Sequence, residues 1–567
     1  MSNVFNLIKP QAKLPRNGFD LSQRHLLTAK VGQLLPILTL DCVPGDHHEI
    51  NVMEMARTMP VNTDAFVRMK QYFEFYFVPY EQIQGNFNQF ITQRDDPFST
   101  NITNQKDQCV CYGLRDMLHR VVDMKQEDIK DIHGFSAADN ALRLLDLLGY
   151  GAHYGNYTNV NYRECYRAFK MNPFRLCAYQ KIWYDYYRNA YFDNEGFFEP
   201  VSNSYIPYIY SYNVDDCIEE ADIDTARGVE RQLPMFQLHY RQWKKDLFTG
   251  LLPDATFGSV TYVDMAGYHE AEWQDIQDVN GVGIDVYAIL KAQALQKWRE
   301  ATMRSGNRVQ DNWRAHYGVE PRYHRDTRAQ FVGAFDSMIG IDEVVQTAGY
   351  DNQTLGAIGG KGIGGANGTI NFDCNDFGVL MCIYSVLPTA DYDAIGIDKA
   401  NTLFDHFDFF TPEFENLGFE PVQTHQLNGY CTPAQGFPGS VHLLDVLGYA
   451  PRYYMYKTAV DKVHGEFMSK LSPQTPTMSD GSNGASSSGS LSHWVSTRRD
   501  YTYIGVDGDG HSPYQPTLST LYVNPKVMDS VFVNTAQSSQ QTDQVMINSN
   551  FDIKSVRNMS VLGLPQF

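Results

Sequence analysis

Apolar and polar residues follow strand-like patterns in several short stretches near the two ends of the chain. Residues 35–42 form an apolar run that a Pro-Gly turn ends, residues 48–55 alternate, and residues 70–78 are dense in aromatic side chains. Residues 375–387 are apolar on both faces, and residues 543–554 alternate again. Short runs of this kind, bounded by turn residues, are typical of antiparallel strands. Because too few of them lie near the N-terminus to complete a sheet, we expect their partners to come from far along the chain.

Two stretches between these strands have the spacing and the end signals of helices. Residues 136–149 contain a serine suited to the N-cap, three leucines on one face and a terminal glycine. A second helix is predicted to begin at Asp285 and to end before Gly306. By contrast, the glycine-rich segment 355–368 and the polar tract 471–493 are predicted to be flexible loops.

A third helix is predicted at residues 172–189, and its apolar and aromatic residues lie on every side. A helix that is apolar all round is buried on every side. Its large aromatic residues include Tyr179, Trp183 and Tyr187, which are of the types that protein interfaces favour. Two interpretations remain open: a helix held between subunits, with these three residues at the interface, or a core helix of one large domain.

The first thirty residues carry five lysine or arginine residues against a single aspartate. Prolines and a glycine among them argue against regular structure, so we expect residues 1–30 to form a basic, extended arm before a single domain at 31–567. The candidates for contact with DNA are Lys9, Lys13, Arg16 and Arg24. The alternative is a purely structural arm that reaches a neighbouring subunit, or a solvated terminus.

A second basic block lies at residues 291–328, where arginine and lysine are interleaved with tryptophan and tyrosine. This pattern is typical of proteins that bind single-stranded nucleic acid. It is equally typical of subunit interfaces, where arginine and aromatic residues are enriched. We favour the interface, with Arg314 and Tyr317 as candidate contact residues.

The composition narrows the class of protein further. The chain has 567 residues, of which 13% are aromatic and only 20% charged, and its formal net charge is −20. Most of its surface therefore repels phosphate, and any contact with nucleic acid must be local. Nine cysteines at irregular spacing are expected to be reduced thiols. No run of signal-peptide length begins the chain, so we expect a cytoplasmic product.

No stretch of the sequence carries the full pattern of a catalytic or metal site. Gly360, Gly362 and Gly365 satisfy G-x-G-x-x-G, but no β-branched strand precedes them and no helix follows. The stretch VDGDGH begins like a calcium loop and lacks the closing glutamate. His47 and His48 are adjacent rather than spaced for a helical zinc site. The sequence therefore predicts no catalytic residue, no metal and no cofactor.

Seven long and unusual sequence blocks follow one another along nearly the whole chain. They are QYFEFYFVPY at 71–80, PFRLCAYQKIWYDYYRN at 173–189, YRQWKKDLFTGLLPDATFGSV at 240–260, RSGNRVQDNWRAHYGVEPRYHRDTRAQFVGAF at 304–335, FDFFTPEFENLGFEPV at 407–422, LGYAPRYYMYKTAVDKVHGEF at 447–467 and TDQVMINSNFDIKSVRNMSVLGLP at 542–565. Together they resemble the major capsid proteins of the Microviridae, the small icosahedral single-stranded DNA phages. The resemblance is strongest to the gokushovirus-type branch.

That resemblance implies a mainly β fold, an eight-stranded antiparallel jelly-roll sandwich with helical and loop insertions at about 81–370 and 391–540. It implies a non-enzymatic capsid protein that self-assembles, in about sixty copies, into a T=1 icosahedral shell around a circular single-stranded DNA genome. The implied partners are the chain itself, that genome, a small basic DNA-binding protein, a DNA pilot protein and a host surface receptor, without membrane insertion. We expect the protein in the virion, after synthesis in the cytoplasm of a bacterial host.

The residues alone leave one alternative open. Aromatic richness, acidity and a β-sandwich also suit a carbohydrate-binding or carbohydrate-active protein. Size distinguishes the two, because a capsid protein forms closed shells or pentamers, whereas an enzyme of this kind forms a small oligomer.

Overall fold

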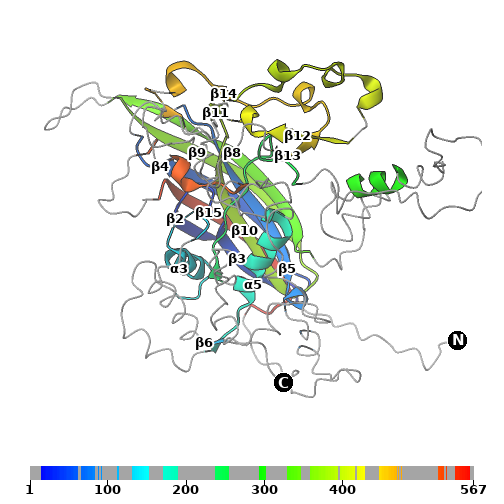
Figure 1. Ribbon diagram of the computed structural model, residues 1–567. Coiled ribbons are helices and arrows are strands. Elements are labelled where there is room, and N and C mark those ends of the chain that lie inside the picture. The colour runs from blue at the N-terminus through cyan, green and yellow to red at the C-terminus, as the bar shows by residue number, and fades with distance from the viewer. Residues whose placement is uncertain are drawn as a thin grey trace, which may run out of the picture.

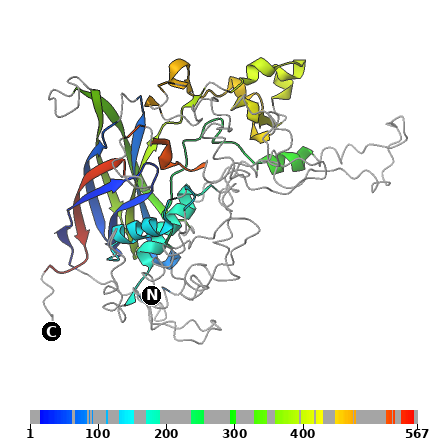
Figure 2. The same ribbon diagram turned by 60° about the vertical axis from the view of Figure 1, so that its left-hand side comes forward.

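The computed structural model describes most of the predicted strands and part of the sequence between them. The described residues are 15–61, 66–83, 131–151, 170–189, 236–253, 293–301, 328–345, 358–393, 396–427, 446–475, 521–532 and 543–561, with short gaps inside several ranges, and also 87, 91 and 112–113. Their largest unit is one curled antiparallel sheet, seen in Figure 1 and, turned, in Figure 2.

The elements keep the labels of Figure 1. The strands are β1 (Asn17–Asp20), β2 (Gln23–Ala29), β3 (Leu35–Cys42), β4 (His47–Thr58), β5 (Met69–Pro79), β6 (Tyr112–Gly113), β7 (Lys170–Met171), β8 (Gln330–Val345), β9 (Ile358–Asp373), β10 (Gly378–Pro388), β11 (Tyr392–Asp393), β12 (Phe419–Gln423), β13 (Val446–Pro451), β14 (Lys462–Val463) and β15 (Val545–Arg557). The longer helices are α3 (Ala137–Leu147), α5 (Phe174–Ile182) and the π-helix η2 (Trp183–Tyr187), and residues 293–301 are also helical. Short 3₁₀ helices are η1 (Tyr80–Gln82), η6 (Lys399–Thr402), η7 (His406–Asp408), η8 (Pro412–Phe414), η9 (Thr424–Gln426), η10 (Tyr454–Tyr456), η11 (Gly465–Met468) and η14 (Pro525–Met528).

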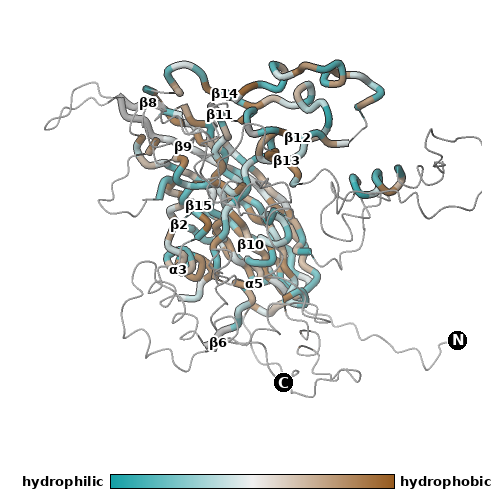
Figure 3. The backbone as a smooth tube through the Cα atoms, viewed as in Figure 1, coloured by the Kyte–Doolittle hydropathy of each residue, from teal (hydrophilic) through white to brown (hydrophobic). Residues whose placement is uncertain are grey.

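The main sheet joins strands from both ends of the chain, as the sequence predicts. Its order is β1-β15-β4-β9-β8-β5-β10-β3, with β2 also paired to β15, and these pairs are antiparallel. Alternate residues of β4 and β15 are buried, whereas β10 is buried at every position. Hydrophobic and hydrophilic residues accordingly alternate along many strands in Figure 3. The mainly β, antiparallel prediction is confirmed, while the specific jelly-roll topology stays a prediction.

The glycine-rich segment is a strand, so the prediction of a flexible loop at 355–368 is wrong. Residues 358–373 form β9, which pairs with β4 on one side and β8 on the other. A Cβ at Gly368 would lie 2.5 Å from the ring of Phe335, and one at Gly362 would lie 2.6 Å from Thr58. The glycines therefore leave room for bulky side chains of β4 and β8, the neighbours of β9 in the sheet, and they do not signal flexibility here.

The N-terminal arm and the insertions also differ from the expectation. Residues 17–29 are not irregular, because β1 and β2 pair with successive parts of β15 and gain its backbone hydrogen bonds. Lys9 and Lys13 lie outside the described residues. Strands β8 and β9 fall within 81–370, a stretch expected to be an insertion, and both are interior strands of the sheet.

Two of the predicted helices are present with the expected ends. Ser136 caps α3 by accepting a hydrogen bond from the backbone N–H of Asp139 at 3.4 Å, and Gly149 follows with φ +80°. Helix α5 begins at Phe174 with Pro173 as N-cap, and η2 continues it. Of the helix predicted from Asp285, the described part, 293–301, is helical. Among the described helices, none combines the length and the apolar character needed to cross a membrane.

Candidate assembly surface and buried polar clusters

Helix α5 packs against β5 and β10, and most side chains of α5 and η2 are buried by the chain itself, whereas Tyr186 is 37% exposed. The hydroxyl of Tyr179 donates to the carbonyl of Leu34 at 3.0 Å and accepts from the N–H of His239 at 3.1 Å. The ring of Trp183 stacks on that of His239, with centroids 3.7 Å apart. Tyr179, Trp183 and Tyr187 are all buried in the single chain, which is the arrangement of the core-helix alternative. A role for them at a subunit interface stays a prediction.

A partly buried ion pair, with side chains 17% and 14% exposed, lies at the end of η2. The guanidinium of Arg241 donates to both carboxylate oxygens of Glu74, at 2.7 and 3.1 Å, and to the hydroxyl of Ser385 at 3.0 Å. The hydroxyl of Tyr187 donates to the same carboxylate, and burial raises the pKa of Tyr187, which keeps this hydroxyl protonated. The guanidinium also lies 4.1 Å from the ring centroid of Tyr72. These contacts join η2, β5, β10 and the segment around Arg241.

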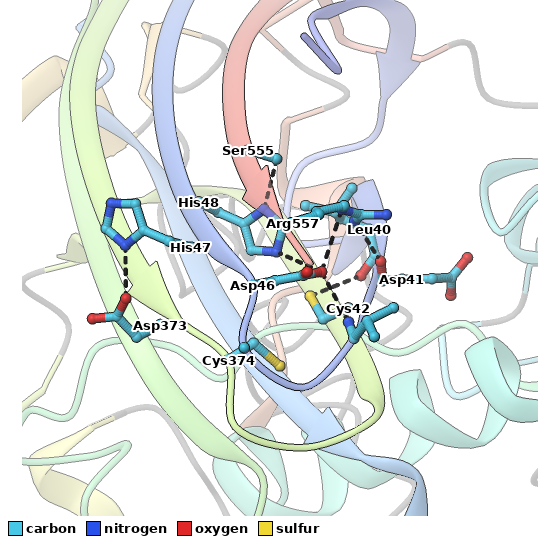
Figure 4. Close-up of polar contacts among 12 residues, drawn as sticks. Leu40, Asp41, Cys42, Asp46, His47, His48, Asp373, Cys374, Ser555 and Arg557 are labelled. Carbon is cyan, nitrogen blue, oxygen red and sulfur yellow. Dashed lines mark hydrogen bonds and ion pairs between the residues drawn. The ribbon is translucent and has the colours of Figure 1, made fainter. Parts of the chain in front are cut away.

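A second polar cluster fixes the turn between β3 and β4 to the last strand, β15 (Figure 4). The carboxylate of Asp46 accepts from the N–H of Val43 at 2.9 Å and lies 3.3 Å from Nε of Arg557. The same carboxylate lies 3.6 Å from Nε2 of His48, whose Nδ1 is 2.7 Å from the hydroxyl of Ser555. The cluster therefore connects strands that are about five hundred residues apart in the sequence.

The cluster has the residue types of a hydrolytic triad but not its accessibility. Ser555 is 1% exposed, His48 0% and Asp46 2%, so a substrate cannot reach the hydroxyl. Burial lowers the pKa of His48 to about 4, which keeps the imidazole neutral at physiological pH. We infer that the cluster is structural.

His47 and His48 point to opposite faces of β4. His47 is partly exposed, and its Nδ1 lies 2.7 Å from the carboxylate of Asp373 on β9, as Figure 4 shows. Because the two imidazoles diverge, they cannot bind one ion together. Within the described residues, no group of three histidine, cysteine or acidic side chains could hold a metal. The described cysteines are free thiols, including Cys42 and Cys374 near this turn, as predicted.

A third polar cluster lies inside the curled sheet. The amide of Gln71 on β5 donates to Glu54 on β4 and to the hydroxyl of Ser337 on β8, both at 2.7 Å, and accepts from the hydroxyl of Tyr384 at 2.9 Å. Strands β4 and β5 are separated by β9 and β8 in the sheet order, so this contact spans the interior. One oxygen of Glu54 has no hydrogen-bond partner, and burial raises the pKa of this carboxyl group to about 7.

A cluster of exposed apolar side chains covers the segment that follows β11. We call it the aromatic surface: Ile397, Phe404, Phe407, Phe409, Phe410 and Tyr456. It lies on the group of short elements at the top of Figure 1, beyond the main sheet. Phe404 is 88% exposed, the most of any large apolar side chain described.

The predicted DNA-facing residues do not come together in the described part. Arg16 donates to the carbonyl of Gly45 at 3.2 Å, and Arg24 on β2 donates to the side-chain oxygen of Asn548 at 2.7 Å. Lys9, Lys13, Arg314 and Tyr317 lie outside the described residues.

Neither the aromatic surface nor the ion pair of Glu74 and Arg241 was predicted from the sequence. The aromatic surface had a local signal, because residues 404–414 contain five phenylalanines, and a proline at 412 interrupts their partly helical spacing. The ion pair had none, because Glu74 and Arg241 are 167 residues apart and their neighbours in sequence give no sign of pairing.

Two comparisons with known proteins both identify this chain as similar to phage capsid proteins. A family model described as "Capsid protein (F protein)" matches residues 9–112 and 260–475, more than half of the chain. The "Capsid protein VP1" of Chlamydia phage 1 is 21% identical over 555 residues, covering 83% of this chain and 87% of that relative. Both descriptions are of structural proteins of a virion, not of enzymes. The chain therefore belongs to the F protein family of capsid proteins, as its resemblance to the capsid proteins of the Microviridae predicts.

Proposed function

We propose that this protein forms a T=1 icosahedral shell of about sixty copies around a circular single-stranded DNA genome. The observation that carries the proposal is the family match, which covers β1 to β5 in its first part and β8 to β14 in its second. The curled antiparallel sheet supports it, because sandwiches of this class are common in viral capsids.

The charge of the chain suggests how DNA is held inside such a shell. A net charge of −20 repels phosphate, so the genome needs local cations and a basic partner. We propose Lys9, Lys13, Arg16 and Arg24 as DNA-facing residues. A small basic DNA-binding protein supplies the remaining positive charge.

Further partners follow from the same proposal. They are a DNA pilot protein and a host surface receptor, with synthesis in the cytoplasm of a bacterial host and no membrane insertion. We further propose subunit contacts at Arg314 and Tyr317, and at Tyr179, Trp183 and Tyr187 of the helix 174–187.

The test is the nucleic acid that purified particles protect. Nuclease-treated particles are expected to yield circular single-stranded DNA. Replacing Lys9, Lys13 and Arg16 with glutamine is expected to lower the slope of log retention against log salt by about two, since each lost phosphate contact removes about 0.7. Lys470→Gln, which removes an exposed lysine outside the arm, is the control. Double-stranded DNA or no DNA in the parent particles would refute the proposal.

A further inference from the structure

The aromatic surface is too concentrated to be ordinary exposed apolar area. Single exposed apolar residues are normal, whereas a contiguous group marks an interaction site. Phe404, Phe407, Phe409 and Phe410 lie within seven consecutive residues and are all exposed, and Tyr456 lies beside Phe410 with ring centroids 6.4 Å apart.

The surface is held in shape without a partner. Asp405 and Asp408 form a capping box at η7, which fixes the turn that carries Phe407. The ring of Phe407 packs edge-on against Phe414 at 5.1 Å, and Phe410 packs edge-on against the buried Tyr453 at 5.3 Å. A preorganised surface loses little conformational entropy on binding, which favours a docking role.

The charge of the surface indicates what binds to it. Residues 404–415 contain four acidic residues and neither lysine nor arginine. Glu415 is paired with Lys457 at 3.1 Å, and Arg452 donates to the carbonyl of Phe407 at 3.3 Å, so the surface has only a small excess of negative charge. A matching partner is apolar, free of acidic groups and contains arginine, because arginine and methionine both contact aromatic rings favourably.

The chain itself carries a surface of that kind, which we call the sheet face. It is the outward side of β2, β15, β4 and β9. Three adjacent rows across these strands contain no acidic residue: Arg24–Asn550–Met53–Asn367, Leu26–Asn548–Met55–Gly365 and Thr28–Met546–Arg57–Ile363. Leu26, Met53, Met55 and Ile363 are exposed, with Leu26 at 70%, and Met546 is half-buried. Depletion of acidic groups with methionine and arginine present is typical of interface centres.

One copy cannot cover its own sheet face with its aromatic surface. Figure 2 shows β2 and β15 on one side of the molecule and the elements around residues 396–456 on another. Helices α3 and α5 pack against β3, β5 and β10, which leaves the sheet face without a described helix over it. Two different surfaces that meet between copies generate a ring, the building block of a shell, when the rotation between the copies closes.

We propose that the aromatic surface of one copy docks on the sheet face of a second copy. The inference rests on the proposed function, because it assigns one contact of the self-associating shell. The contact is head-to-tail, so each copy uses both of its surfaces. A copy with a defective aromatic surface and a copy with a defective sheet face can therefore form only one intact contact with each other.

The test uses two variants of the full chain. Phe404→Asp with Phe409→Asp disables the aromatic surface, and Met55→Glu with Arg57→Glu disables the sheet face. Each variant alone is expected to stay monomeric at 64.6 kDa, with a melting temperature close to that of the parent. An equimolar mixture is expected to form dimers of about 129 kDa and no shells, because each pair retains one intact contact.

Conservative variants are the controls. Phe404→Leu with Phe409→Leu, and Met55→Leu with Arg57→Lys, are expected to assemble as the parent does. Shells from either charged variant, or a mixture that stays monomeric, would overturn the inference. If the aspartate variant unfolds, Phe404→Ser decides instead, because this highly exposed side chain contributes little to the fold.

The two proposals fail in different ways. A parent that forms shells while the charged variants also form them refutes only the head-to-tail contact. A parent that forms small oligomers, which the charged variants dissociate, refutes the shell and supports the contact. A parent that stays monomeric refutes both.

Discussion

Replacing Arg241 with methionine is expected to lower the free energy of unfolding of the subunit by about 3–5 kcal/mol. The substitution removes both hydrogen bonds from Arg241 to the carboxylate of Glu74 and leaves this carboxylate, only 14% exposed, without its cation. The hydroxyl of Tyr187 alone cannot replace a bidentate guanidinium. Denaturation of the unassembled subunit in urea measures the loss.

The matched control removes both charges. In Glu74→Gln with Arg241→Met, the amide oxygen still accepts from Tyr187 and no buried charge is left unpaired. The double variant is expected to recover most of the lost stability, because replacing a whole buried pair is often nearly neutral. A single variant within about 1 kcal/mol of the parent would show that the pair does not hold η2 against the sheet.

Glu54 is expected to make the folded subunit less stable as the pH rises toward neutrality. Burial raises the pKa of this carboxyl group to about 7, from an ordinary value of 4.5. Between these values the folded chain holds a proton that the unfolded chain has released, so raising the pH favours unfolding. At about 1.4 kcal/mol per pH unit, the effect reaches about 3 kcal/mol at pH 7.

His48 is expected to act in the opposite direction under acid conditions. Burial lowers its pKa to about 4, from an ordinary value of 6.5. Between these values the unfolded chain binds a proton that the folded chain does not, so stability falls as the pH falls. The two effects oppose each other between about pH 4.5 and 6.5, and the pH profile of the parent conceals both.

Single variants separate these two effects. The unfolding free energy of Glu54→Gln relative to the parent is expected to rise by about 3 kcal/mol from pH 4.5 to 8. That of His48→Asn is expected to rise by a similar amount as the pH falls from 7 to 4. Parallel pH profiles for the parent and the two variants would contradict the assignment of these groups.

Local pattern was enough to predict β4, β10 and β15, because each strand shows its burial in its own sequence. Local pattern failed for β9, because its glycines make room for Phe335 and Thr58, which lie on other strands and do not appear in the local sequence. It failed for β1 and β2, because their regular structure comes from pairing with β15.

The candidate sites divide in the same way. An aromatic helix has the same composition whether its own chain or a neighbour covers it, so the sequence could not choose for Trp183. The contacts of Glu74 with Arg241, and of His48 with Ser555, depend on the folded sheet and have no sequence signal. The exposed phenylalanines of the aromatic surface were readable, but only as an irregular cluster.

The mass of the assembled particle tests the central claim most directly. A closed T=1 shell of about sixty chains of 64.6 kDa has a mass of about 3.9 MDa before any DNA is counted. Charge-detection mass spectrometry of nuclease-treated, DNA-free particles is expected to give a single narrow peak at that mass. A distribution confined to monomers and small oligomers, at any protein concentration and salt, would contradict a shell-forming subunit.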